Sequence, residues 1–115
     1  MSEIKQIIDR INAFRDERDW RQFHNPKNLA MALSVEAAEI VEQFQWLTLE
    51  QSLNLDQEKK EKVQHELADV AIYLLYLCDD LNIDILEAVE NKMEINAEKY
   101  PAKSTKGSAK KYNEE

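Results

Sequence analysis

The chain has 115 residues and a formal net charge of −8, enough for one domain with one hydrophobic core and too few for two. The acidic balance disfavours nucleic-acid polymers and anionic membranes as partners, and no apolar run approaches the roughly 20 residues that span a bilayer. One glycine, two prolines and abundant Glu, Lys, Leu and Ala indicate an all-α protein.

The first predicted element is an amphipathic helix that Ser2 caps and that ends at about Arg18. Its apolar residues recur at helical spacing, at Ile4, Ile7, Ile8, Ile11 and Phe14. This start lacks the basic and then apolar pattern of a signal segment, and the single cysteine, Cys78, has no second cysteine for an internal disulfide. We therefore expect a cytoplasmic protein.

Two central helices are predicted to be apolar on several faces. Asn25 is the expected N-cap of a helix over about 26–46 that begins with a proline. A short connection over 48–55 leads to a helix from its cap Asp56 to about Leu81, whose second half is almost wholly apolar. Because one small domain cannot cover both helices, we expect subunits to pack against one another.

The fourth predicted helix follows its cap Asp84 and ends near residue 100, because Pro101 cannot continue it. A polar, lysine-rich tail over 102–115 follows, so the helical domain is expected to cover 1–101. Four helices joined by short links predict a four-helix bundle, completed by the packing of subunits.

Two pairs of acidic residues interrupt the apolar helices. Glu36 and Glu39 stand three apart, as do Glu66 and Asp69, so each pair projects from one face of its helix. A lone pair at this spacing is most often solvated surface, but carboxylates within such apolar helices are disfavoured unless a cation meets them. Hard oxygen ligands favour Mg²⁺, with Mn²⁺ as a substitute, over zinc. Since Mg²⁺ commonly joins carboxylates to substrate phosphates, the four residues indicate phosphate chemistry.

Two other interpretations compete with a magnesium site. A di-iron bundle needs Glu-x-x-His on two helices, whereas His65 directly precedes Glu66, so the spacing argues against it. The alternative of a different class is a non-catalytic protein that senses nucleotides or acts as a helical scaffold. A scaffold has no use for four carboxylates in apolar helices, and their removal should stabilise it.

The segments SVEAAEIVEQFQW and HELADVAIY, which carry the acidic pairs, resemble the MazG-like all-α nucleotide pyrophosphohydrolases. The resemblance covers nearly the whole chain, over 14–24, 34–46, 65–73, 92–101 and 106–108. The short dCTP pyrophosphatase branch is the most similar, because it shares the Asp-Trp and Phe-Gln-Trp signatures that end here at Trp20 and Trp46.

This resemblance implies a bundle that assembles into dimers and often tetramers, with Glu36, Glu39, Glu66 and Asp69 as catalytic Mg²⁺ ligands. It also implies cleavage of a nucleoside triphosphate between the α- and β-phosphates, giving the monophosphate and pyrophosphate, with any one of the carboxylates as the general base. The implied substrate is dCTP or a related or modified deoxynucleotide, in house-cleaning of the nucleotide pool. Ile11 stands where animal members have a base-contacting histidine, which leaves a broader or non-cytosine preference open.

Aromatic residues and one histidine are candidates for contacts to the nucleoside. Trp20 and Trp46 offer flat surfaces that could flank the base, with core packing as the other interpretation. His24 lies in the loop beside Trp20, where it can reach a ligand. Tyr73 is four residues beyond Asp69 and shares the acidic face, where its hydroxyl could hold the sugar or a phosphate.

The C-terminal part carries candidates for phosphate contacts. Lys92 and Asn96 form a stripe on the fourth helix that suits phosphate oxygens, although solvated surface is the commoner role of such a stripe. Lys106 and the other tail lysines concentrate positive charge beside Gly107, and the tail could close over the triphosphate of its own or a neighbouring subunit. A merely solubilising tail is the alternative.

Overall fold

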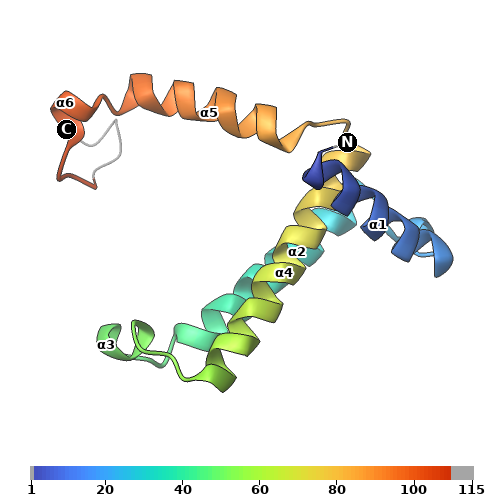
Figure 1. Cartoon of the computed structure of the whole chain (residues 1–115), viewed down its shortest axis with the longest axis horizontal. Helices are drawn as coiled ribbons and strands as arrows, with labels where there is room; N and C mark the ends of the chain where they lie inside the picture. The colour runs from blue at the N-terminus through green and yellow to red at the C-terminus, as the bar shows by residue number, and fades with distance from the viewer. Residues whose placement is uncertain (1, 110–115) are drawn as a thin grey trace. The chain divides into compact units, whose positions relative to one another are not determined.

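The part of the chain that this computed structural model describes, residues 2–109, is built from helices and contains no strand (Figure 1). In chain order the helices are α1 (Glu3–Glu17), the 3-10 helix η1 (Arg21–Phe23), α2 (Pro26–Phe44), α3 (Leu49–Ser52), α4 (Gln57–Asp80), α5 (Ile85–Lys99) and α6 (Ala102–Thr105). The four long ones are those that the sequence predicts, and α3 is a single turn within the predicted short connection. The all-α class is therefore confirmed. No described helix has both the length and the apolar character needed to cross a bilayer.

Each long helix begins at a side chain that accepts a hydrogen bond from the backbone N–H three residues further on. These bonds measure 3.2, 2.9, 2.8 and 3.1 Å for the caps Ser2, Asn25, Asp56 and Asp84. Pro26 takes the first position of α2, where its missing N–H costs nothing. An N-cap of this kind contributes about 1 kcal/mol. The starts of the helices thus follow from local sequence, as predicted.

The ends of the helices depend on backbone turns. Asp19 and Asn82 have φ angles of 53° and 56° shortly after α1 and α4, in the left-handed region that ends a helix and that Asp and Asn tolerate. The helix α2 ends at Phe44, two residues before the predicted end, because the Leu47 N–H donates to the Phe44 carbonyl at 2.9 Å and tightens the chain into a turn. Trp46 therefore lies just outside the helix.

The chain divides into two compact units after Asn82. The helices α1 to α4 form the first unit, and α5 and α6 form the second. The domain boundary predicted after residue 101 is a different division and stays a prediction. Lys110 and Lys111 of the predicted tail, with the rest of 110–115, lie outside the described residues.

In the first unit α2 and α4 lie side by side, with α1 packed against the C-terminal end of α4 (Figure 1). The two central helices run antiparallel: the Lys59 ammonium near the start of α4 donates to the Gln43 side chain near the end of α2 at 3.2 Å. The buried apolar residues are Leu29, Val63, Leu75, Tyr76 and Cys78. This pairing sets the middle of α2 against the middle of α4, which is where the acidic residues lie.

Several large apolar side chains of α2 and α4 are exposed in this unit. The exposed residues Met31, Val35 and Val41 of α2, which we call its outer stripe, have 56, 57 and 59% of their surface exposed. Leu67 and Leu74 form an outer stripe on α4, one above the other at a seven-residue spacing. Exposed apolar residues on helices that also contribute to the core are typical of a surface that another chain covers.

Candidate functional site

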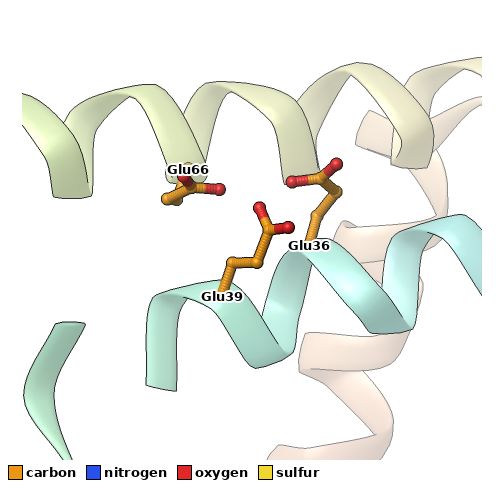
Figure 2. Close-up of side chains that lie close together, drawn as sticks. All are labelled: Glu36, Glu39 and Glu66. Atoms are coloured by element: carbon orange, nitrogen blue, oxygen red, sulfur yellow. The ribbon is translucent and has the colours of Figure 1, made fainter. Parts of the chain in front are cut away.

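Three glutamates meet between α2 and α4. Glu36 and Glu39 stand one turn apart on the side of α2 that faces α4, and Glu66 points toward them from α4 (Figure 2). One carboxylate oxygen from each lies within 4.8 Å of the others. We call these residues the glutamate cluster. Three carboxylates at this distance repel one another unless protons or a cation reduce their charge.

The electrostatics of the cluster follow from this crowding. Burial, then a hydrogen bond with Glu39 and the charges around it, raise the pKa of Glu36 to about 7. The pKa of Glu66 is raised, first by its hydrogen bond with Glu39 and then by burial. The pKa of Glu39 is lowered, because Glu66 and Glu36 both stabilise its charge by hydrogen bonds. The cluster thus holds a shared proton near neutral pH when no cation is bound.

A bound cation fits the donors that the cluster offers. One oxygen of Glu36 and one of Glu66, both labelled Oε2, are buried without a hydrogen-bond partner. Buried carboxylate oxygens normally have partners, so two orphaned oxygens in one cluster of carboxylates fit a site for a positive group. The donor set is oxygen only, which suits Mg²⁺ or Mn²⁺.

The raised pKa of Glu36 predicts that the metal-free protein loses stability as the pH rises. A carboxyl whose folded pKa lies above its unfolded value of 4.5 contributes stability that is present below the unfolded pKa and is lost as the pH rises through about 7. Because the carboxyl is partly exposed, we expect a loss of ~1 kcal/mol between pH 5 and pH 8. Urea unfolding in a chelator measures it. Glu36→Gln should flatten this pH dependence, and an unchanged slope in this variant would contradict the assignment.

Asp69, the fourth predicted carboxylate, lies at the edge of the cluster and outside the group of oxygens within 4.8 Å of one another. It is exposed one turn beyond Glu66. Its charge still contributes to the raised pKa of Glu36 and of Glu66. The residue therefore belongs to the same electrostatic centre, at its solvent side.

Tyr73 connects this centre to the loop before α2. Its pKa is raised by burial, then by the charges of Glu36 and Asp69, so the hydroxyl stays protonated beside them. The centre of its ring lies 6.5 Å from that of His24, which in turn lies 5.3 Å from that of Tyr76. The structure thus brings the predicted residues His24 and Tyr73 together at one end of the acidic face.

Sequence reasoning missed Arg15, whose side chain is completely buried. Its guanidinium donates two hydrogen bonds to Asp80 of α4, at 2.7 and 3.1 Å. The Nη1 atom, which donates one of them, also lies 3.3 Å from the Nδ1 atom of His24. A signal was available, because Arg15 follows Ile11 by four residues and so continues the apolar stripe of α1 at helical spacing. A charged residue at an inward position indicates a buried partner.

The two predicted base-stacking residues lie apart within one chain. Trp20, 42% exposed, packs edge-on against Phe14 at the end of α1, with ring centres 5.6 Å apart. Trp46 is 87% exposed and follows the opposite end of α2. The 19 residues of α2 between them correspond to about 28 Å, too far for one base to contact both within a chain.

The predicted phosphate contacts lie in the second unit. Lys92 and Asn96 are exposed and one turn apart on α5, and Lys106 directly follows α6, where Gly107 adopts a φ of 84°. A hollow of about 410 Å³ beside α3, lined by residues between Leu47 and Lys62, contains none of the predicted site residues.

Comparison with known proteins agrees with these features. The sequence model of the MazG-like family matches residues 31–114 of this chain. The chain is 43% identical to dCTP pyrophosphatase 1 of Rattus norvegicus over 108 residues and to that of Homo sapiens over 110 residues. These alignments cover 91% and 93% of this chain but 64% and 65% of the two relatives, so the chain spans just under two thirds of their length.

A solved structure matches along almost its whole length. It is the crystal structure of a pyrophosphatase from Archaeoglobus fulgidus, with a TM-score of 0.83 and 43% identity, and the match covers 88% of this chain and 94% of that one. The likeness therefore includes the paired helices that carry the glutamate cluster. With the family match extending over most of its residues, the chain belongs to the MazG-like family.

Proposed function

We propose that this protein is a metal-dependent nucleotide pyrophosphohydrolase that converts a deoxynucleoside triphosphate to the monophosphate and pyrophosphate. The observation that carries the proposal is the glutamate cluster, with its two orphaned carboxylate oxygens between apolar helices. Carboxylates so placed suit a divalent cation that also binds phosphate oxygens.

The relatives support the reaction and suggest the substrate. Proteins named dCTP pyrophosphatase 1 share 43% identity with this chain, and a pyrophosphatase has the same fold. We therefore place dCTP, or a related or modified deoxynucleotide, first among the candidate substrates, in a role that clears the nucleotide pool. A cytoplasmic location would suit this role, because nucleoside triphosphates are used there.

In the proposed reaction a water molecule attacks a phosphorus of the triphosphate and the bond from phosphorus to the bridging α–β oxygen breaks. Mg²⁺, or Mn²⁺ in its place, would be held by Glu36, Glu39 and Glu66 with Asp69 at the solvent side, and would neutralise charge on the phosphate oxygens and lower the pKa of a water. One carboxylate of this set accepts the proton of the attacking water.

Residues around the cluster are proposed to bind the rest of the nucleotide. The Tyr73 hydroxyl, kept protonated beside Glu36 and Asp69, is a donor for a sugar or phosphate oxygen. His24 is a second polar group at this end of the site. Further contacts to the phosphates are assigned to Lys92, Asn96 and Lys106.

We also propose that the protein works as a homo-oligomer, a dimer or a dimer of dimers. The outer stripes of α2 and α4 supply an apolar surface of the kind that subunits bury. An oligomer would also explain the two tryptophans, since Trp20 of one subunit and Trp46 of another could flank one base although they are far apart in a single chain.

The proposed function predicts pyrophosphate release from dCTP in the presence of Mg²⁺. A panel of canonical and modified triphosphates should give monophosphate and pyrophosphate as the first products, separated by anion exchange, with the highest kcat/KM for a cytosine deoxynucleotide. Added EDTA should stop turnover and excess Mg²⁺ should restore it. Release of inorganic phosphate in the first step would contradict the reaction. Nucleotide binding without any turnover would favour the nucleotide-sensing alternative.

A further inference from the structure

The buried guanidinium of Arg15 joins three elements of the first unit. Besides its two hydrogen bonds to Asp80, its Nε donates to the Asn12 side chain at 3.0 Å, and the side chain of Asn12 donates to Asp79 at 2.9 Å. The guanidinium also stacks over the Tyr76 ring, 4.3 Å from its centre. These contacts hold the guanidinium in one position. Its Nη1 atom also contacts the Nδ1 atom of His24.

This contact decides which nitrogen of His24 carries the proton. A guanidinium has donors only, so the Nδ1 atom of His24, 3.3 Å from the Arg15 Nη1 atom, must accept the hydrogen bond. A neutral imidazole that accepts at Nδ1 is protonated at Nε2. Protonation of Nδ1 would break the bond and place a second cation against the first. His24 is therefore a neutral ring whose Nε2–H donor points away from Arg15.

The charged groups around His24 favour the same state. Burial and then the charge of Arg15 lower the pKa of His24, with Arg21 acting in the same direction and Asp80 against it. Arg21 is itself paired with Asp16 of α1, and its carbonyl accepts the His24 backbone N–H at 3.1 Å. The backbone of His24 is thus held at the end of η1, and the charges around its ring favour the neutral state.

We propose that Arg15 and Asp80 are positioning residues that hold His24 as the neutral Nε2–H tautomer beside Tyr73, so that His24 donates a hydrogen bond to an oxygen of the bound nucleotide. This inference rests on the proposed function for the nucleotide, but not for the tautomer. His24 and Tyr73 then present two neutral donors at the end of an acidic face, where the substrate brings its acceptor oxygens.

If Arg15 only joined α1 to α4, its contact with His24 would not be needed. The Tyr76 hydroxyl already ties α4 to α1, since it donates to the Ile11 carbonyl at 2.6 Å, and Asn12 with Asp79 forms a second tie. Asp80 holds the guanidinium by two bonds, the geometry that fixes its plane as well as its place. A guanidinium fixed in this way keeps one N–H aimed at the imidazole.

The test reads the tautomer directly. Long-range ¹H–¹⁵N spectra of the full chain at pH 7.5 should show for His24 a protonated Nε2 and an unprotonated Nδ1, with the His65→Gln variant used to assign the two histidines. In the double variant Arg15→Met/Asp80→Leu, which replaces the buried pair by apolar side chains, His24 should become a mixture of tautomers. This measurement needs no turnover, so its failure is distinguishable from a failure of the proposed function.

Kinetics of the same variants test the consequence. The double variant should raise KM for the preferred triphosphate about tenfold, the effect of losing one well-placed hydrogen bond, while kcat changes less. His24→Gln, which keeps a donor near the Nε2 position, should retain more kcat/KM than His24→Leu. A protonated Nδ1 in the wild type would overturn the proposal. So would a folded double variant with wild-type KM, or equal activity of the two His24 variants.

Discussion

Glu39→Gln is expected to lower kcat/KM for the preferred triphosphate by about 10³-fold without unfolding the protein. Glu39 lies between the other two glutamates and shares hydrogen bonds with both, and it is the one whose pKa is lowered, so it carries negative charge throughout the neutral range. The amide has nearly the same shape but no charge. The loss of one charged oxygen ligand should therefore weaken the cation site and leave the packing of α2 intact.

The measurement combines steady-state kinetics with a Mg²⁺ titration followed by thermal unfolding. Wild type should be stabilised by Mg²⁺, and Glu39→Gln should lose most of this response. Glu42→Gln is the matched control, because Glu42 is exposed on the same helix and outside the cluster. It should keep activity within about twofold, as surface substitutions usually do. Equal losses in the two variants would show that charge on α2 in general, and not the cluster, is responsible.

The glutamate cluster could be predicted in large part because its geometry is local. A spacing of three places Glu36 and Glu39 on one face of α2, and the apolar residues around them indicate that this face is covered. The same spacing is less decisive for Glu66 and Asp69. Three residues advance a helix by about 300°, so the two side chains differ in direction by about 60°. Only the packing of α4 against α2 decides that Glu66 points inward while Asp69 stays at the solvent side.

Contacts between distant segments could not be predicted in this way. Arg15 and Asp80 are 65 residues apart. The apolar stripe of α1 indicates an inward position for Arg15, but no local pattern in either helix identifies Asp80 as its partner, because their pairing follows from the packing of α1 against the end of α4. The distance between Trp20 and Trp46 has a different origin, because it follows from the length of α2, which local sequence predicts. Local signals thus predict helices and faces, and packing decides which faces meet.

A charge on the outer stripe of α2 is expected to separate the subunits. Met31→Glu and Val41→Glu each introduce a carboxylate on a side of α2 that is apolar and exposed in the single chain. If this side is buried in the oligomer, the carboxylate must be desolvated, which costs several kcal/mol and raises the dissociation constant by about 10³-fold or more. In a symmetric dimer the same stripe is present on both subunits, so one substitution acts twice.

Sedimentation velocity over a range of protein concentrations distinguishes the outcomes. Wild type should sediment as a dimer or tetramer, while both variants should shift to monomers at micromolar concentration and retain their helical content. Gln57→Glu adds the same charge on the exposed start of α4 and should leave the assembly unchanged. Activity should fall together with assembly if Trp20 and Trp46 of different subunits contact one base. A monomeric wild type would contradict the oligomer, whereas monomeric variants with full activity would assign the outer stripes to assembly alone and place the whole substrate site within one chain.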